Sequence, residues 1–324
     1  MIKNQITTEN YTLINADCVE VMQEIPDNST DLQVFSPPFL GLFNYSSSEK
    51  DFSNCDSREQ GLDQYEFLVK ELSRVLKPGR ICAVHCTDLM NKDGSLFDYP
   101  NAIMKIHEQN GFKYRNKITI WKEPLKVRMR TMVRSLMHKL IVEDSTECFT
   151  AMPDYVLIFK KDGENEIPVT HEFGLTHYAG SHPMLPEMAK KYGSLEDLRK
   201  KYAGWKDPKT NKLSHIIWQR YASSVWDDIR IDEVLKFKES KDEDDEKHVH
   251  PLQLDVIDRI VELYSNMDEV VLTPFMGVGS EVYSPVSMGR KAIGIELKES
   301  YFKQAIKNLN EVKNRFDDGQ VELF

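Results

Sequence analysis

Residues 31–39 read Asp-Leu-Gln-Val-Phe-Ser-Pro-Pro-Phe, a short apolar run that ends in two prolines. Consecutive prolines cannot donate to a sheet ladder and cannot continue a helix, so a strand over 32–35 must end at Ser36 and pass into a stiff turn. In that turn the Ser36 hydroxyl and the Pro37 carbonyl can accept hydrogen bonds, and the Phe39 ring can stack. The turn can therefore hold a flat ring that carries an amino group. The alternative interpretation is an ordinary strand end with a core phenylalanine.

A second motif lies near the other end of the chain. Residues 269–273 form an apolar run that leads directly into Pro-Phe-Met-Gly-Val-Gly-Ser at 274–280, and another apolar run at 291–295 ends at Glu296. Glycines let a backbone approach a ligand closely, and an acid at the end of the second strand can bind ribose hydroxyls. Glu296 follows Gly279 by 17 residues, close to the ~20 typical of such units. The third glycine of a dinucleotide motif is missing, which favours a smaller adenosine ligand over NAD or FAD.

Strand and helix patterns alternate along most of the chain. We predict helices over 19–25, 65–76, 102–108, 251–263, 280–288 and 300–312, and further strands over 11–14, 80–86, 117–121 and 155–161. This alternation indicates an α/β fold with a mainly parallel sheet and helices on both faces. Ligands of such sheets bind at the carboxyl ends of the strands, so both motifs can serve one site only if strands from the two chain ends lie side by side. We therefore expect a circularly permuted, doubly wound, Rossmann-like sheet.

The predicted organisation has three parts. Residues 1–162 form a catalytic half, residues 163–247 an inserted region without a strand–helix rhythm, and residues 248–324 a second half that completes the sheet. No run of about 18 apolar residues occurs, so we expect no membrane span. The N-terminus lacks the apolar core of a signal peptide, and the five cysteines are scattered, which favours a reducing cytoplasm.

The formal net charge of -10 argues against a nucleic-acid binder, but the charge is unevenly distributed. Residues 113–139 carry nine lysines and arginines against one acid, and residues 190–220 carry nine against three. The acidic residues concentrate elsewhere, notably in 239–246. A chain of this kind can carry a basic face for nucleic acid; ordinary solvated helices are the alternative.

Four motifs in this order resemble a known family. They are Asn-Ala-Asp-Cys at 15–18, Ser-Pro-Pro-Phe at 36–39, His-Pro at 250–251 and Pro-Phe-Met-Gly-Val-Gly at 274–279. Together they resemble the S-adenosylmethionine-dependent DNA amino-methyltransferases of the β arrangement, in which the target-base motif precedes the recognition region and the cofactor motif comes last. The resemblance covers residues 11–161 and 248–310. It implies S-adenosylmethionine as cofactor, double-stranded DNA as partner and methylation of an exocyclic amino group.

The resemblance also implies roles for single residues at the cofactor. Asp17 would bind the adenine amino group, Cys18 the adenine ring through its backbone, and Glu296 the ribose. The methionine end would lie against Phe275 and the backbone of 277–279, including Gly277 and Gly279. Asp17 can at the same time cap the helix that follows it.

Two residues depart from the family pattern. Thr273 stands where the family usually has an aspartate, so a hydroxyl without charge faces the methionine portion of the cofactor. Glu281 stands where the family commonly has threonine.

The catalytic turn implied by the resemblance is Ser36, Pro37, Pro38 and Phe39. The target base must be flipped out of the duplex to reach it. Family members with aspartate in the first position mostly act on adenine N6, so Ser36 favours cytosine N4. Adenine N6 in DNA or RNA remains an alternative, as does a catalytically silent DNA-binding protein on the same scaffold. Attack at cytosine C5 is excluded because it needs a covalent thiolate, and the Pro-Cys dipeptide of such enzymes is missing.

Several basic residues are candidates for contact with DNA. Phosphate contacts are expected from Lys122, Lys126, Arg128, Arg130, Arg134 and Lys139. The insert would read base edges, with Arg220, Lys206, Lys209 and Asn211 as candidates. We expect Trp205, Trp218 and Trp226 to pack in the core of the insert. His85 lies on the opposite strand face from Cys82 and Cys86, so we expect it to be buried in the sheet and not to bind a metal. A homodimer and a separately acting cognate restriction endonuclease stay open as partners.

Overall fold

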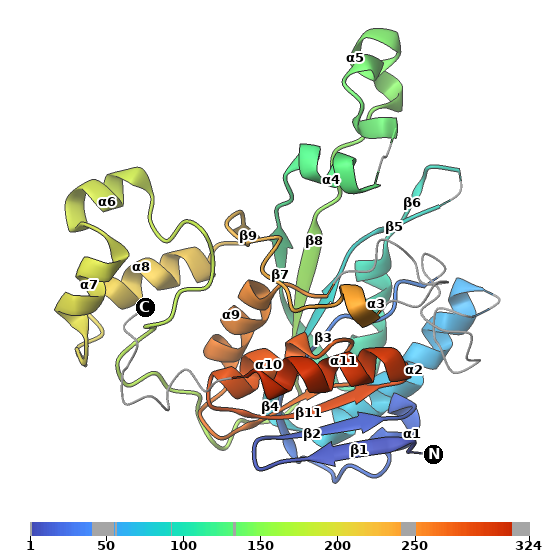
Figure 1. The fold of residues 1–324 in the computed structure, drawn as a ribbon, viewed down its shortest axis with the longest axis horizontal. Coiled ribbons are helices and arrows are strands. Elements are labelled where there is room, and N and C mark those ends of the chain that lie inside the picture. The colour runs from blue at the N-terminus through green and yellow to red at the C-terminus, as the bar shows by residue number, and fades with distance from the viewer. Residues whose placement is uncertain are drawn as a thin grey trace.

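One large mixed sheet organises the chain (Figure 1). The computed structural model describes residues 2–40, 55, 57–91, 93–131, 134–240 and 251–312. Nine strands of this described part form the sheet, in the order β1-β2-β11-β10-β3-β4-β8-β7-β9. Their bounds are β1 (Asn4–Thr7), β2 (Tyr11–Asn15), β3 (Thr30–Phe35), β4 (Leu76–Cys86), β7 (Phe112–Ile120), β8 (Asp154–Lys161), β9 (Val225–Trp226), β10 (Val270–Thr273) and β11 (Lys291–Glu296). A separate two-stranded ribbon joins β5 (Leu89–Met90) and β6 (Leu96–Phe97).

Strands from the two ends of the chain alternate in the middle of the sheet. β10 pairs in parallel with β3 on one side and with β11 on the other, and β11 pairs in parallel with β2. β3 and β4 are also parallel, so five neighbouring strands point the same way. The predicted permuted, doubly wound fold is confirmed. Its switch point lies between β10 and β3, where ligands of such sheets bind.

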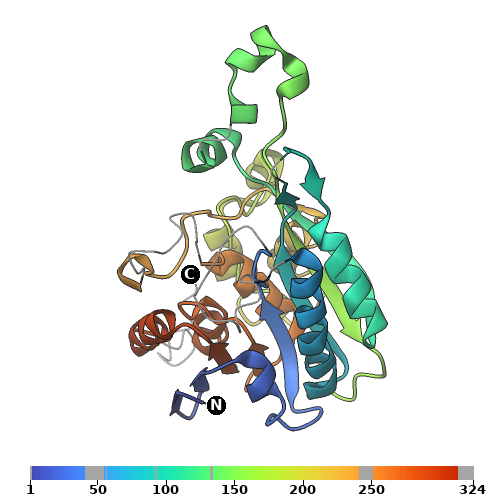
Figure 2. The ribbon, with the colours of Figure 1, turned by 90° about the vertical axis from the view of Figure 1, so that its right-hand side faces the viewer.

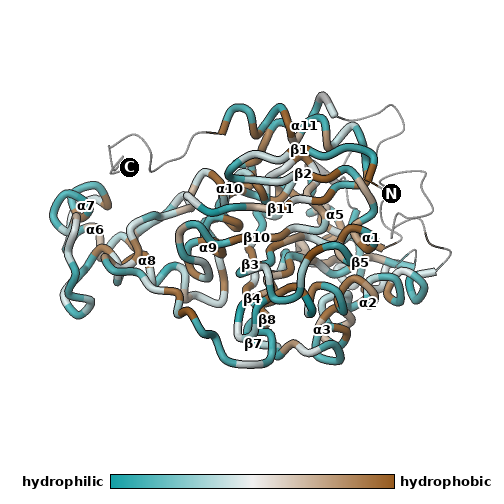
Figure 3. Tube along the Cα trace, turned by 90° about the horizontal axis from the view of Figure 1, so that it is seen from below, coloured by the Kyte–Doolittle hydropathy of each residue, from teal (hydrophilic) through white to brown (hydrophobic). Residues whose placement is uncertain are grey.

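Helices cover both faces of the sheet. α1 (Cys18–Met22), α2 (Arg58–Val75) and α3 (Tyr99–Gln109) lie on one face, and α9 (Leu254–Tyr264), α10 (Ser280–Ser287) and α11 (Glu299–Asn310) on the other. Seen from below, the strands follow one another in sheet order, with α1, α2 and α3 beside them opposite α9 and α10 (Figure 3). Side chains alternate between the faces along each strand, so Leu32 and Val34 pack toward α9 while Phe35 packs toward α2.

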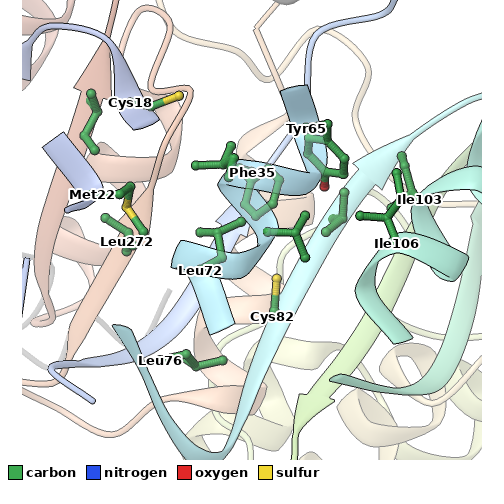
Figure 4. Close-up of a cluster of buried hydrophobic side chains, with 14 of the residues drawn as sticks. Cys18, Met22, Phe35, Tyr65, Leu72, Leu76, Cys82, Ile103, Ile106 and Leu272 are labelled. Atoms are coloured by element: carbon green, nitrogen blue, oxygen red, sulfur yellow. The ribbon is translucent and has the colours of Figure 1, made fainter. Parts of the chain in front are cut away.

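The core beneath α2 joins the two chain ends. Leu72 of α2, Phe35 of β3 and Leu272 of β10 belong to one buried cluster, together with Cys18 and Met22 of α1 (Figure 4). α2 buries apolar residues at helical spacing, as its sequence predicts. Each large aliphatic side chain buried there contributes on the order of 1.5–3 kcal/mol. This packing fixes the end of β3 against the end of β10.

An arm of residues 121–153 rises between β7 and β8 (Figures 1 and 2). It contains α4 (Pro124–Thr131), α5 (Lys139–Glu143) and short 3-10 turns at Arg134–Leu136 and Ser145–Glu147. β8 is antiparallel to both β4 and β7, so β7 runs parallel to β4. The arm therefore leaves the sheet at the same edge at which the parallel strands end. It exposes the apolar side chains of Leu125, Met129 and Val142.

The region after β8 contains α6 (Pro186–Tyr192), α7 (Leu195–Tyr202), α8 (Lys212–Tyr221) and a 3-10 turn at Lys238–Ser240. Its helices share a small apolar cluster of their own. An ion pair of 2.7 Å between Arg259 of α9 and Asp228 ties this region to the sheet domain. The boundaries set at 163 and 247 remain predictions. No helix of the described chain is both long and apolar enough to cross a membrane.

The prediction that the three tryptophans pack in the core of the insert is wrong: Trp226 is buried, but in the cluster between the sheet and α9, and the other two are exposed. Trp226 is 1% exposed, but Trp205 and Trp218 are 44% and 53% exposed. The buried face of α8 carries Leu213, Ile217 and Tyr221 at four-residue spacing, and Trp218 lies beside that face.

Candidate active site

The Ser-Pro-Pro-Phe turn leaves β3 at the switch point. Ser36 is half-buried and follows the last strand residue, Phe35. The Tyr99 hydroxyl donates to the Pro38 carbonyl at 2.9 Å, which fixes the second proline of the turn. Among the described residues, nothing donates to the Pro37 carbonyl. Phe39 is half-buried against the cluster beneath α2.

The ends of β2 and β11 lie together at the same edge. The Asn15 side-chain amide donates to the Glu296 carbonyl at 2.7 Å and to the Leu297 carbonyl at 3.1 Å. Asp17 then caps α1, accepting at Oδ1 from the Val19 amide at 2.8 Å, as predicted. This arrangement places the Asp17 and Glu296 carboxylates at neighbouring strand ends.

Cys18 begins α1 in the buried core. Burial, reinforced by the Asp17 carboxylate, raises the pKa of its thiol well above the usual value. The thiol therefore stays protonated at neutral pH.

The glycine turn between β10 and α10 requires left-handed backbone at Gly277, with φ of 55°, and at Gly279, with φ of 98°. The Glu296 carboxylate accepts from the Gly277 amide at 2.8 Å and from the Lys298 amide at 2.7 Å. A Cβ at Gly279 would lie 3.2 Å from the Ala305 Cβ, so α11 packs closely behind the turn. A Cβ at Gly277 would meet no atom within 4 Å, so that side of the turn is open to a ligand.

Thr273 and Glu281 are the two departures from the family pattern, and both are buried. Among the described residues, the Thr273 hydroxyl has no hydrogen-bond partner. A buried polar atom without a partner is unusual and fits a bound polar group. Burial, reinforced by the Glu296 carboxylate, raises the pKa of Glu281 to about 8, so this side chain is mostly neutral at pH 7. The open turn, the unpaired hydroxyl and the two strand-end carboxylates together fit S-adenosylmethionine.

The two motifs meet across the switch point. The register of β10 with β3 pairs Val271 with Leu32, and the Phe35 and Phe275 rings lie 6.0 Å apart. The catalytic turn and the glycine turn therefore leave adjacent strands at the same edge. The structure thus brings together the residues that the sequence assigned to one site from opposite ends of the chain.

His85 is a polar neighbour of Ser36 that the sequence reasoning did not assign to the site. The expected burial is confirmed, with His85 8% exposed. Its Nδ1, however, lies 3.1 Å from Ser36 Oγ. A histidine within an apolar run, at the carboxyl end of the strand after β3, was the available signal. Its use required knowing that β3 and β4 pair with Phe35 opposite Val84.

The candidate phosphate-binding residues are divided between two places. Lys126, Arg128, Arg134 and Lys139 lie on the arm, and the side chain of Arg130 is outside the described residues. The Lys122 ammonium instead lies 2.5 Å from the carboxylate of Asp154.

The proposed base readers of the insert are mostly engaged within the protein. Arg220 pairs with Asp227 at 2.5 Å and with Asp228 at 3.4 Å. Lys206 pairs with Glu172. Asn211 is 1% exposed and its amide donates to the Phe173 carbonyl at 2.9 Å, so it is not free to read a base edge. Lys209 remains exposed.

Known proteins match the chain along nearly its whole length. A family model described as DNA methylase matches residues 30–307. Type II methyltransferase M.BamHI of Bacillus amyloliquefaciens is 26% identical over 96% of this chain, and M.MthZI of Methanothermobacter thermautotrophicus is 24% identical over 93%. The chain spans 60% of the length of the first and 79% of the second.

Two solved structures share the fold. A protein named as a DNA modification methylase from Thermus thermophilus superposes with a TM-score of 0.59 at 20% identity, covering 94% of this chain and 96% of its own. The cytosine-N4-specific PvuII DNA methyltransferase superposes with a TM-score of 0.59 at 14% identity, covering 97% and 93%.

Proposed function

Because the chain belongs to the DNA methylase family, we propose that it transfers a methyl group from S-adenosylmethionine to an exocyclic amino group of a flipped base in double-stranded DNA. The observation that carries this proposal is the meeting of the Ser-Pro-Pro-Phe turn with the glycine turn at the switch point. Matching relatives named as type II methyltransferases support a role in DNA modification. A homodimer and a cognate endonuclease remain open, and we expect the protein to act in the cytoplasm.

The chemistry must overcome the weak nucleophilicity of the amino nitrogen, whose lone pair is delocalised into the ring. Bound S-adenosylmethionine supplies an electrophilic methyl group on a sulfonium. The protein supplies two acceptors, Ser36 Oγ and the Pro37 carbonyl, which draw the amino hydrogens out of the ring plane. This localises the lone pair on nitrogen in the direction of attack. Most of the acceleration is then positioning, since both acceptors sit on a turn with fixed backbone.

Binding of the flipped base costs a few kcal/mol of unpairing and unstacking. Stacking on Phe39 offsets about 1–3 kcal/mol of that cost. Asp17 would hold the adenine of the cofactor and Glu296 its ribose. Phe275 and the Gly277–Gly279 backbone would line the methionine end, with Thr273 beneath it.

We propose cytosine N4 as the target, with adenine N6 as the alternative. The support is the serine in the first position of the turn, because members of the resembled family with aspartate there mostly act on adenine N6. Names among the relatives do not decide between the bases: the PvuII enzyme is cytosine-N4-specific, while YhdJ of Escherichia coli, 22% identical, is a DNA adenine methyltransferase.

The decisive test is chemical identification of the product. Duplex DNA of mixed sequence is incubated with the protein and S-adenosylmethionine, digested to nucleosides and analysed by mass spectrometry. We expect N4-methylcytosine. N6-methyladenine would overturn the base assignment alone. No methylated nucleoside, together with no saturable binding of S-adenosylmethionine, would favour a silent DNA-binding protein.

The role of Ser36 has its own test. Ser36→Ala removes one acceptor at the amino group, so we expect turnover to fall about 10²–10³-fold, on the scale of a lost positioned group at a reacting centre. The affinity for S-adenosylmethionine should change less than about two-fold. Ser29→Ala is the matched control. The Ser29 hydroxyl donates to the Pro26 carbonyl in the turn before β3, at the amino end of the strand that Ser36 follows. Unchanged turnover in Ser36→Ala would refute the role.

A further inference from the structure

His85 forms the wall of the site behind Ser36. It is the penultimate residue of β4, and Ser36 Oγ lies 3.1 Å from its Nδ1 and 3.3 Å from its backbone carbonyl. With a neutral imidazole that leaves Nδ1 unprotonated, both atoms are acceptors for the Ser36 hydroxyl hydrogen. That hydrogen is then directed toward His85, which leaves a lone pair of Oγ to accept from the amino group of a bound base.

A buried carboxylate and a lysine stand on the other side of the imidazole. His85 Nε2 lies 3.3 Å from Oδ2 of Asp154, which is close enough for an ion pair. The two atoms are not aligned for a hydrogen bond. Asp154 is the first residue of β8, next to β4, and is 6% exposed. Its Oδ1 accepts from the Lys122 ammonium at 2.5 Å. Four side chains therefore form a continuous line from the catalytic turn to the base of the arm.

The electrostatics of this line suit an imidazole that receives a proton. Burial alone would raise the pKa of Asp154, but the Lys122 ammonium and the His85 ring outweigh burial and lower this pKa to about 2. Asp154 is therefore a carboxylate at every working pH. A carboxylate at Nε2 favours a proton on that nitrogen, leaves Nδ1 as the acceptor, and stabilises an imidazolium once one forms.

Simple structural need does not account for the arrangement. The Ser36 hydroxyl already has the backbone carbonyl of residue 85 as an acceptor, so its hydrogen bond does not require an imidazole. Burying the charge of Asp154 costs free energy of desolvation. An apolar residue as the first residue of β8 would avoid this cost. Other charged groups near this strand end are Asp88, Asp98 and Lys117, which influence the neighbouring Cys86 thiol and, within the described part of the chain, form no hydrogen bond or ion pair with His85.

We propose that His85, held by Asp154 and Lys122, is the positioning residue of Ser36 and accepts the proton that Ser36 relays from the target amino group. The proposal rests on the proposed function. As the new carbon–nitrogen bond forms, the methyl–sulfur bond breaks and its electron pair stays on sulfur, which becomes neutral. The nitrogen then holds one proton in excess. That proton passes to Ser36 Oγ while the hydroxyl proton moves to His85 Nδ1, and water removes it from the imidazolium before the next turnover.

The closing experiment separates proton acceptance from hydrogen bonding. In His85→Asn the side-chain oxygen can take the place of Nδ1 as an acceptor, but it cannot be protonated. Asp154→Asn leaves the imidazole and removes the charge behind it. His107→Gln is the matched control, because His107 is a buried histidine of α3 that contacts the Ile103 carbonyl and has no contact with Ser36. Single-turnover methyl transfer is measured against pH, with thermal unfolding of every variant.

We expect the wild-type rate to fall at acid pH, because the proposed relay needs a free acceptor at Nδ1 of His85. His85→Asn should be slower by about 10²-fold, which is the lower end of general-base effects. Its rate should also no longer fall at acid pH. Asp154→Asn should be about ten-fold slower than the wild type, and its rate should fall at a different pH. His107→Gln should keep the wild-type profile even if its melting temperature falls. A His85→Asn profile parallel to that of the wild type would overturn the proposal.

A second readout uses the protein without cofactor or DNA. Nitrogen NMR of the imidazole reports which ring nitrogen carries the hydrogen. We expect the wild-type His85 ring to carry it on Nε2, with Ser36→Ala changing the Nδ1 signal and Asp154→Asn changing the Nε2 signal. A neutral ring protonated on Nδ1 would overturn the proposal. No methyl transfer by the wild type would overturn the proposed function, whereas transfer with an unaltered His85→Asn profile overturns only the role of His85.

Discussion

Thr273 stands at the carboxyl end of β10, fully buried, and its hydroxyl has no partner among the described residues. An unsatisfied buried hydroxyl costs about 1–3 kcal/mol, so a residue of this kind is retained only where something else gains from it. From its position beneath the glycine turn, we propose that a hydrogen bond to the cofactor is that gain. The hydroxyl takes the place at which the resembled family usually has a carboxylate.

The substitution Thr273→Val tests this interpretation because its two effects have opposite signs. Loss of an unpaired hydroxyl should leave the free energy of unfolding of the ligand-free protein unchanged or raise it by about 1 kcal/mol. Loss of a hydrogen bond to the cofactor should weaken S-adenosylmethionine binding by roughly 2–12-fold, which corresponds to 0.5–1.5 kcal/mol. Chemical denaturation and titration calorimetry measure the two quantities.

Thr30→Val is the matched control at the start of the neighbouring strand. Thr30 is equally buried, but its hydroxyl donates to the Val75 carbonyl at 3.1 Å. Thr30→Val should therefore destabilise the protein and leave cofactor affinity as it is. If Thr273→Val destabilised the ligand-free protein in the same way, its hydroxyl would have a structural partner and the interpretation would fail.

Single residues were predictable where their chemistry is local. The cap at Asp17 and the strand end at Ser36 follow from neighbours in sequence, and the structure has both. The line from Ser36 through His85 to Asp154 and Lys122 was not predictable in this way. It joins four segments through the pairing of β3, β4 and β8, and strand register is a property of the sheet and not of any one segment.

At the scale of elements, α10 combines an open glycine turn with a buried acid. Glu281 lies in the first turn of the helix and is 5% exposed. Its raised pKa of about 8 compares with an ordinary value of 4.5. Between these two values the folded protein binds a proton that the unfolded chain has lost, so this residue makes stability fall as the pH rises from 4.5 to 8. Above pH 8 the loss is complete.

Glu281→Gln should remove this pH dependence, because the amide imitates the neutral acid. We expect the variant to gain little over the wild type at pH 5 and to gain roughly 3 °C or more in melting temperature at pH 8.5. The difference between the two proteins is the relevant quantity, since buried Glu262, whose pKa is raised to about 7, adds a similar trend to both. Glu59→Gln, exposed at the start of α2, serves as control. A gain that is equal at both pH values would show that Glu281 is ionised in the folded state.

The arm of residues 121–153 is the element best placed to meet DNA beside the flipped base, because it leaves the sheet at the edge where Ser36 lies. Neutralising Arg128, Arg134 and Lys139 together should weaken DNA binding. It should also reduce the slope of log affinity against log salt by up to about 2.7, or 0.9 for each DNA phosphate that the arm no longer neutralises. Fluorescence anisotropy at several salt concentrations measures both.

The control for the arm removes the same number of charges elsewhere. Lys105 of α3, Lys113 at the start of β7 and Lys160 near the end of β8 lie away from the catalytic edge. Their replacement by alanine should leave the salt slope within about 0.5 of the wild type. Equal slopes for the two triple variants would remove the arm from the DNA interface.

At the scale of the whole molecule, the meeting of strands from the two chain ends was predictable, because both motifs can serve one site only if those strands lie side by side. The number of strands was not: β1 and β9 are short strands at the two sheet edges, and neither has the length or apolar run that would reveal it in sequence. Edge strands are held by their neighbours, so their existence depends on a sheet that forms from distant segments.

The same arrangement predicts how the cofactor stabilises the protein. The candidate cofactor residues come from the segment that follows β2 and from the glycine turn and β11, which lie more than 250 residues later in sequence but beside β2 in the sheet. Binding should therefore slow amide hydrogen exchange in residues 11–19 and 273–296 together, and leave the helices of residues 186–221 unchanged. At a cofactor concentration of 100 times Kd, the free energy of unfolding should rise by about 2.7 kcal/mol. Asp17→Ala should lower the affinity and reduce protection in both segments. Protection confined to residues 273–296 would mean that the N-terminal strand takes no part in binding, and the composite site would have to be abandoned.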